Sequence, residues 1–231
     1  MTGVVRIALV GTGKMGRTIA ALAAERGLPV VATLGRGTPI TRETLGGADV
    51  AIEFTEPGAA PASVRACAAA GCPVVVGTTG WYDQLPALSA EVERAGTAML
   101  WAANFSIGVN VFLGMAAHAA RALAAAGFDS HLVETHHARK KDAPSGTALA
   151  IADAVARGGA PRPPVTSVRT GHVPGTHELL FDAPFEQVRL VHEARDRRVF
   201  ADGALAAARW LVGRRGVFTM ADVLGLPEGS R

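Results

Sequence analysis

Val4-Val-Arg-Ile-Ala-Leu-Val-Gly-Thr-Gly-Lys-Met-Gly16 is the stretch that decides the fold of this chain. A short apolar run leads into a glycine loop, and an Ala-rich helical pattern follows at once. Strands that read as continuous apolar runs are those covered on both faces, as in a parallel sheet. The stretch therefore predicts a buried parallel strand, a tight turn and a helix.

The same alternation continues through the first hundred residues. Helical patterns are expected at residues 15–26, 59–70 and 84–94, and they separate strand candidates at residues 4–10, 30–34, 50–54, 74–77 and 98–101. Short connections marked by Gly and Pro between strands and helices are typical of right-handed βαβ units. We therefore expect an α/β fold with a doubly wound parallel sheet.

The pattern changes after about residue 105. A long helix at residues 109–126 leads to a strand that ends in His136-His137, and another helix begins near Thr147. Strand-like segments follow at residues 165–170, 178–181 and 188–193, and then helices at residues 203–213 and 220–224. This order predicts a second, smaller α+β domain built on an open mixed sheet.

The glycine loop matches the sequence G-x-G-x-x-G in the context that a dinucleotide requires. The first glycine allows the tight turn, the second lets a pyrophosphate approach bare backbone, and the third lets helix and strand pack closely. The loop predicts a Rossmann-type cofactor site, with a glycine-rich turn of another α/β protein as the alternative. The candidate cofactor residues here are Gly11, Thr12, Gly13, Lys14 and Met15.

The end of the second strand favours NADPH weakly over NADH. No acidic residue lies between Glu25 and Glu43, so the carboxylate that usually holds the adenosine ribose is missing there. Arg36 instead suits a 2′-phosphate. The alternatives are equal use of NADH and NADPH, and a solvated surface arginine.

Two further segments follow strand candidates at the edge where α/β sheets bind ligands. Gly77-Thr78-Thr79-Gly80 offers close approach, hydroxyls and amides, and Ala102-Ala103-Asn104-Phe105 lies where the composition changes. Both are candidate cofactor contacts, although a tight turn would explain each nearly as well.

The segment from Glu134 to Thr147 reads Glu-Thr-His-His-Ala-Arg-Lys-Lys-Asp-Ala-Pro-Ser-Gly-Thr. Cations beside a helix start attract carboxylates, so the segment predicts a pocket for a small di-anion. A solvated basic turn is the alternative. The candidate residues are His136, His137, Lys140, Ser145, Gly146 and Thr147.

The bulk composition excludes other classes of protein. The net charge of +3 in 231 residues is too weak and evenly spread for a nucleic-acid partner. Cys67 and Cys72 have no His, Asp or Glu beside them, so we expect no metal. The Ala-rich stretch at residues 109–126 contains His118 and Arg121, so no membrane segment and a soluble intracellular protein are expected.

These motifs together resemble the dihydrodipicolinate reductases. The resemblance runs over nearly the whole chain, and the string His136-His-Ala-Arg-Lys-Lys-Asp-Ala-Pro-Ser-Gly-Thr147 is its most diagnostic part. The other matching segments, in order, are residues 10–16, 53–55, 77–80, 103–106, 108–110 and 200–204.

The resemblance implies a dinucleotide-binding domain of residues 1–105 and 200–231. Residues 106–199 would then bind substrate and form a homotetramer. It also implies NADPH- or NADH-dependent reduction of 4-hydroxy-tetrahydrodipicolinate, a small cyclic dicarboxylate, in cytoplasmic diaminopimelate and lysine biosynthesis. His136 would be the catalytic acid/base and Lys140 the proton donor, while His137, Lys140, Ser145, Gly146 and Thr147 hold the substrate. The alternatives are another two-domain NAD(P)-dependent dehydrogenase of an amino-acid-derived substrate, and a catalytically inactive dinucleotide-binding regulator.

Overall fold

The computed structural model describes residues 3–226, which divide into two compact units. The first comprises residues up to Phe105 together with Arg198–Val223, and the second comprises Ser106–Arg197 together with the residues from Leu224 onward. The chain thus re-enters the first unit two residues before the position that the sequence suggested.

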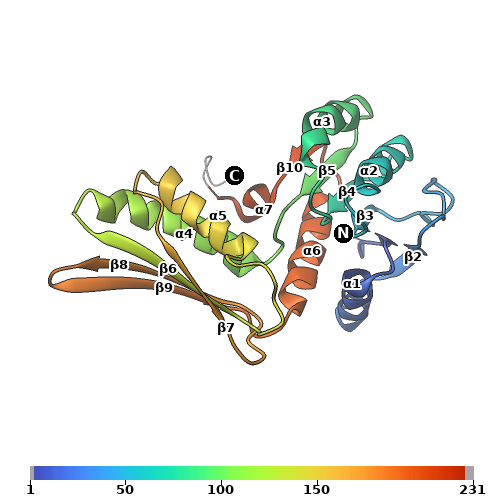
Figure 1. The fold of residues 1–231 in the computed structure, drawn as a ribbon. Coiled ribbons are helices and arrows are strands. Elements are labelled where there is room, and N and C mark those ends of the chain that lie inside the picture. Colours follow the sequence, from blue (N-terminus) through green and yellow to red (C-terminus); the bar gives the residue numbers. More distant parts are fainter. Residues whose placement is uncertain (1–2, 227–231) are drawn as a thin grey trace. The chain divides into compact units, whose positions relative to one another are not determined.

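The first unit is built on a six-stranded parallel sheet with the order β10-β5-β4-β3-β1-β2 (Figure 1). Its strands are β1 (Ile7–Val10), β2 (Val30–Leu34), β3 (Val50–Glu53), β4 (Val74–Val76), β5 (Ala98–Trp101) and β10 (Gly216–Phe218). Its helices are α1 (Lys14–Glu25), α2 (Ala60–Ala69), α3 (Leu85–Arg94), α6 (Arg198–Leu211) and α7 (Met220–Leu224), the last of which crosses the unit boundary, with a 3-10 turn η1 (Tyr82–Gln84). This is the doubly wound Rossmann-type sheet that the sequence predicts.

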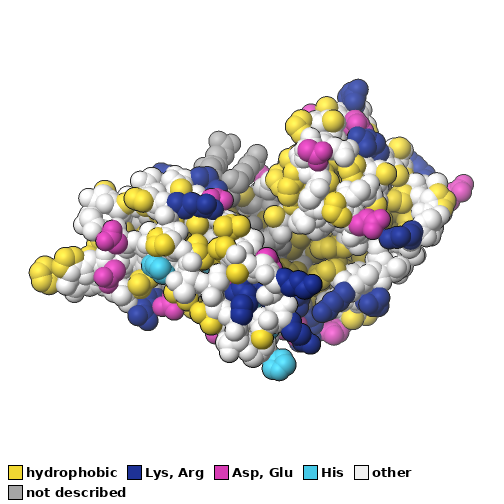
Figure 2. Space-filling model, in the orientation of Figure 1, with side chains coloured by type: hydrophobic (Ala, Val, Ile, Leu, Met, Phe, Trp, Pro, Cys, Tyr) yellow, Lys and Arg dark blue, Asp and Glu magenta, His cyan; other side chains and the backbone are white. Residues whose placement is uncertain are grey.

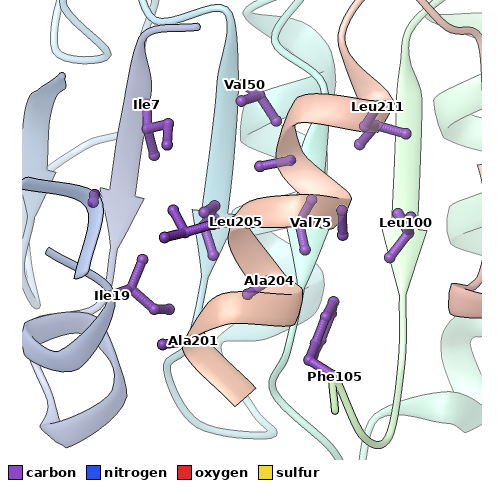
Figure 3. Close-up of a cluster of buried hydrophobic side chains, with 14 of the residues drawn as sticks. Ile7, Ile19, Val50, Val75, Leu100, Phe105, Ala201, Ala204, Leu205 and Leu211 are labelled. Atoms are coloured by element: carbon purple, nitrogen blue, oxygen red, sulfur yellow. The ribbon is translucent and has the colours of Figure 1, made fainter. Parts of the chain in front are cut away.

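Alternate residues of each central strand enter different cores, which explains the continuous apolar runs. In β1, Ile7 and Leu9 pack with α1 and α6, as Figure 3 shows for Ile7, whereas Ala8 and Val10 pack with α2 and α3. Both faces of the sheet are therefore covered by helices, and its free carboxyl edge is left for ligands.

Helix α6 begins five residues earlier than the sequence indicated, at Arg198 rather than at residue 203. Gly203, at which the sequence analysis began this helix, lies inside it. A Cβ there would lie only 1.6 Å from the carbonyl oxygen of Phe105. The glycine is thus a point of close backbone approach inside the first unit. Strand β10 was missed altogether, because three half-buried residues carry no strand signal without their partner β5.

The second unit is a four-stranded mixed sheet with the order β7-β6-β8-β9, with α4 (Ile107–Ala124) and α5 (Gly146–Arg157) on one face (Figure 1). Strand β6 (Asp129–His136) runs parallel to β7 (Val165–Arg169) and antiparallel to β8 (Thr176–Ala183), which pairs antiparallel with β9 (Glu186–Glu193). The open mixed sheet of the sequence prediction is confirmed.

Helix α4 is the one helix within residues 3–226 that is long and apolar enough, by length and composition alone, to cross a membrane. Its side chains Phe112, Ala116 and Ala120 are buried in the core of the second unit, against Leu132 and Leu179 of the sheet. Only one face of α4 packs in this core, since 22% of the helix is buried.

Candidate active site

The strand register of the first unit brings the predicted cofactor segments to one edge of the sheet. Val10 pairs with Glu53, Glu53 with Val76, and Val76 with Trp101, so the residues that follow these strands leave the sheet side by side. Gly11, Gly77 and Ala102 each stand directly after a strand at this edge. The three segments are therefore neighbours, as a single extended ligand requires.

The glycine loop has the geometry of a dinucleotide turn. Gly11 has a positive φ of 112°, and a Cβ on it would lie 2.0 Å from the carbonyl oxygen of Phe54. A Cβ on Gly16 would lie 2.0 Å from the carbonyl oxygen of Gly11, so Gly16 allows helix and loop to pack. A Cβ on Gly13 would meet nothing within 4 Å. The fold therefore does not require a glycine at position 13. A glycine there suits a pyrophosphate that approaches the backbone at the start of α1.

The segment after β4 is held by a buried acid that sequence analysis did not assign a role. Glu53 is fully buried, and one of its oxygens accepts hydrogen bonds from the hydroxyls of Thr78 (2.9 Å) and Thr55. Thr78 also accepts from the amide of Thr55 at 2.7 Å, while burial raises the pKa of Glu53. A Cβ on Gly77 would collide with the Phe54 ring at 2.1 Å. Thr78 is therefore a structural residue of this loop as well as a candidate contact.

The other predicted cofactor residues differ in exposure. Thr79 and Ala103 are exposed, whereas Ala102 and Phe105 are buried, and the Phe105 ring packs 5.9 Å from that of Phe54. Lys14 is exposed, while Met15 packs against the core. The exposed members of this set are the ones free to reach a ligand.

Arg36 lies near an acid that the sequence analysis did not place there. Its Nη2 atom is 3.1 Å from Oε2 of Glu56, which follows β3, and both side chains are exposed. No acidic residue follows the second strand closely in the sequence, but Glu56 lies beside Arg36 in the structure. An exposed ion pair of this kind stabilises by about 0–1 kcal/mol, so it can open readily for a ligand.

In the second unit, strand alternation places a row of polar groups on the helix-covered face of the sheet. Glu134 and His136 lie two residues apart on β6, and in the register Arg169 of β7 lies opposite His136 and His177 of β8 lies opposite Glu134. Leu132, two residues before Glu134, belongs to the apolar core on the same face. The polar row therefore continues this core toward the end of the sheet.

Glu134, His136 and Arg169 form one hydrogen-bond network. Glu134 is fully buried; one oxygen contacts His136 Nδ1 and the other accepts from Arg169 Nη2 at 2.7 Å. Although burial alone would raise it, the pKa of Glu134 is lowered by the Arg169 hydrogen bond and by the charge of His136. The pKa of His136 is lowered by burial and by the charges of Lys140 and Arg169, against the opposing effect of Glu134.

His177 extends the network to the predicted substrate loop. Its Nε2 atom is 3.2 Å from Oγ of Ser145, and its ring lies edge-on to that of His136, with 5.3 Å between centroids. Burial, and then the nearby His136, lower its pKa to about 4, so it is neutral at pH 7. Ser145 caps α5 by accepting from the amide of Ala148 at 3.1 Å. The helix-start prediction for Ser145 is thus confirmed.

The loop between β6 and α5 carries the remaining candidates. Lys140 donates to both carboxylate oxygens of Asp142 at 2.9 Å. His137 and Thr147 are half-buried, while Gly146 is exposed, with open space where a Cβ would stand. Figure 2 shows many of the Lys and Arg side chains in view gathered on one part of the surface, with acidic and apolar side chains scattered over the rest.

The cysteines offer no nucleophile. Cys67 and Cys72 are free and buried, and burial raises the pKa of both thiols, that of Cys72 to about 11. Thiols of this kind are mostly protonated at pH 7 and unreactive. A dehydrogenase that uses a cysteine nucleophile is therefore not supported by either cysteine.

Family models for the N-terminal and C-terminal parts of dihydrodipicolinate reductase match residues 5–105 and 108–224. The chain is 38% identical to 4-hydroxy-tetrahydrodipicolinate reductase of Thiobacillus denitrificans, over 96% of this chain and 99% of that one. The chain belongs to the dihydrodipicolinate reductase family. It is therefore an NAD(P)H-dependent oxidoreductase of amino-acid biosynthesis.

Other relatives and structures agree with this membership. A 4-hydroxy-tetrahydrodipicolinate reductase of Stenotrophomonas maltophilia is 40% identical to this chain, over 92% of this chain and 94% of the relative. Dipicolinate-bound dihydrodipicolinate reductase of Paenisporosarcina sp. TG-14 has the same fold, with a TM-score of 0.78 at 22% identity, covering 94% of this chain and 98% of that one. An amine dehydrogenase of Mycobacterium smegmatis shares the fold at a TM-score of 0.65 and 12% identity, over 98% of this chain and 97% of that one.

Sequence reasoning found the local part of the site and missed the part formed by distant residues. It singled out His136, Lys140 and the Ser145 helix start, but it gave no role to His177. It gave no role to Glu134 or Arg169. The one signal available was the spacing of Glu134 and His136, which share a face of their strand.

Proposed function

We propose that this protein reduces 4-hydroxy-tetrahydrodipicolinate to tetrahydrodipicolinate in diaminopimelate and lysine biosynthesis. The observation that carries the proposal is that His177 links the two parts of the site: its ring packs against that of His136, which Lys140 influences by its charge, and its Nε2 atom contacts Ser145 at the start of α5. In the balanced reaction the substrate loses its hydroxyl group as water, and the resulting unsaturated ring accepts one hydride and one proton. A bound reduced nicotinamide supplies the hydride from its C4 carbon.

The proton is handled by the residues of the second unit. His136 is the acid/base, with an imidazole that is neutral near pH 7 because its pKa is lowered by burial. Lys140 is the proton donor, and it must leave Asp142 when it engages the substrate. A positioned proton donor contributes about 10²–10⁴ in rate.

The carboxylates of the substrate are bound at the start of α5. Ser145, Gly146 and Thr147 are the capping residue and the first two residues of that helix, where backbone amides and the helix dipole favour an anion. His137 and Lys140 stand on the loop that precedes it. The chemistry of this set suits a small cyclic dicarboxylate, the class to which the dipicolinate in the related structure belongs.

The first unit, residues 1–105 with 198–223, holds the dinucleotide along the carboxyl edge of its sheet. The bare backbone at Gly13 receives the pyrophosphate. The remaining contacts are proposed at Gly11, Thr12, Lys14, Met15, Arg36, Gly77, Thr78, Thr79, Ala102, Ala103, Asn104 and Phe105. NADPH is favoured weakly, because Arg36 can exchange the Glu56 carboxylate for a 2′-phosphate.

We infer that the protein is a cytoplasmic homotetramer assembled through the second unit. The face of its sheet opposite α4 and α5 exposes apolar side chains, with Val168 37% and Val191 58% exposed. Phe185, at the turn between β8 and β9, is 99% exposed. Exposed apolar groups concentrated on one sheet are typical of an interface. Light scattering on the purified protein tests the tetramer.

The reaction itself is tested with substrate generated freshly from pyruvate and aspartate semialdehyde. The purified protein is expected to oxidise NADPH, and NADH at a comparable or lower kcat/KM, only when both precursors have been condensed. Absence of oxidation with either cofactor would refute the proposed function and favour an inactive regulator.

A further inference from the structure

We propose that Glu134, paired with Arg169, is the positioning residue of His136: it holds the imidazole at Nδ1 and leaves Nε2 as the nitrogen that exchanges the proton. The inference rests on the proposed function, in which His136 is the acid/base. It adds a residue pair that lies 35 positions apart in sequence.

The geometry is that of an orienting carboxylate behind a histidine. Glu134 and His136 lie on one face of β6, and the Glu134 carboxylate contacts His136 Nδ1. On the other side of the ring, a Cβ on Gly175 would lie 3.0 Å from Nε2. The glycine thus leaves room beside Nε2 that any other residue would reduce.

Arg169 keeps the carboxylate ionised in a site without exposure to water. A buried carboxylate with no partner would be protonated or would strongly destabilise the fold. Arg169 Nη2 donates to Glu134 at 2.7 Å and to the carbonyl oxygen of Asp142 at 2.5 Å. It therefore balances the charge of Glu134 and also ties the substrate loop to the same network.

An ionised Glu134 determines the tautomer of His136. A carboxylate only accepts hydrogen bonds, so the neutral imidazole must carry its proton on Nδ1. Nε2 is then the lone-pair nitrogen, ready to accept a proton and return it. Buried carboxylates hold catalytic histidines by the same rule in hydrolase triads.

A metal site is the competing interpretation of the same cluster. Ligand atoms of Glu134, His136 and His177 lie within 4.8 Å of one another. Both Glu134 oxygens already have partners, however, and the Arg169 guanidinium stands beside them. A neighbouring fixed cation opposes a second one, so the contacts favour a hydrogen-bond network.

The test compares Glu134→Gln, which keeps the size of the side chain and removes its charge, with the wild type. Lower activity is expected, with kcat reduced by up to about 10⁴-fold and KM for substrate and cofactor little changed. Glu134→Asp should recover part of kcat. The control Glu91→Gln removes a Glu–Arg pair of the first unit (2.8 Å) and should leave kcat unchanged.

A pH profile separates positioning from a merely structural role. Because Glu134 raises the pKa of His136 against the larger effect of burial, the limb of the kcat profile due to His136 should move to lower pH in Glu134→Gln. The other charged or titratable groups that face His136 remain in both proteins: Lys140 from the loop, Arg169 from β7 and His177 from β8. An unchanged profile with near-wild-type kcat would overturn the proposal.

Two further measurements separate a failure of the positioning role from a failure of the proposed function. If the wild type is active and His136→Ala is impaired while Glu134→Gln is not, only the positioning role fails. If Glu134→Gln does not fold, the ¹⁵N shifts of the His136 ring in the wild type at pH 8 decide. A protonated Nδ1 is expected, and a neutral ring protonated on Nε2 would overturn the proposal.

Discussion

The ammonium group of Lys140 lies 2.9 Å from both carboxylate oxygens of Asp142, two residues further along the loop. The pair is local and Asp142 is largely exposed, with 59% of its side chain accessible. Its hydrogen bond with Lys140 lowers the pKa of Asp142, so the Asp142 carboxyl is ionised at pH 7. Lys140 is thus held near His136 by a contact that a substrate carboxylate can replace.

Asp142→Asn should have a small effect for this reason. Exposed ion pairs stabilise by about 0–1 kcal/mol, so kcat/KM should change by no more than about fivefold. The melting temperature should change by less than about 4 °C. Steady-state kinetics and thermal unfolding measure both. A loss of activity as large as that of a Lys140 variant would mean that Asp142 itself takes part in the reaction.

Gly13 and Gly16 should separate cofactor binding from folding. The Cβ added by Gly13→Ala would lie in open space, so the melting temperature of this variant should stay near that of the wild type. Its KM for NADPH and NADH should rise. Gly16→Ala places a Cβ 2.0 Å from the carbonyl oxygen of Gly11 and should cost about 1–3 kcal/mol of unfolding free energy. Thermal unfolding and cofactor titration distinguish the two. The interpretation would be wrong if Gly13→Ala bound cofactor as the wild type does.

The contact between Arg36 and Glu56 predicts how cofactor preference can be changed. Glu56→Gln frees Arg36, so kcat/KM for NADPH should rise by up to about fivefold, the equivalent of an exposed ion pair. Arg36→Ala should lower kcat/KM for NADPH and leave that for NADH unaltered. Parallel changes with both cofactors in the Arg36 variant would show that Arg36 does not contact the 2′-phosphate.

His177 should make the fold sensitive to mild acid. Burial, and next the charge of His136, lower its folded pKa from 6.5 to about 4. Its neutral form therefore contributes stability that is complete above pH 6.5 and is lost as the pH falls toward 4. The loss is on the order of 3 kcal/mol. His177→Asn should show a correspondingly smaller drop in unfolding free energy between these pH values in urea titrations. Equal drops in both proteins would contradict this assignment.

The fold could be predicted from the sequence where local patterns are strong. The apolar run at residues 7–10 and the glycine loop specify a buried strand and a turn within one segment. Strand β10 and the start of α6 could not be predicted, because each depends on a distant partner: β5 for Gly216–Phe218, and the Phe105 carbonyl for Gly203.

The site divides in the same way. His136, Lys140 and Ser145 stand within ten positions of one another, so their chemistry can be read from one segment. Arg169 and His177 reach them only through the register of β7 and β8 with β6. The pairing of Arg36 with Glu56 likewise depends on the neighbouring ends of strands. Side chains brought together by sheet pairing carry no signal in a single sequence.

The most direct test of the account is kcat for His136→Ala and Lys140→Ala, measured at saturating NADPH and substrate beside the folded wild type. Each variant should lose about 10²–10⁴ in kcat while keeping its melting temperature. Turnover near that of the wild type in both variants would contradict the claim that this loop carries out the proton chemistry.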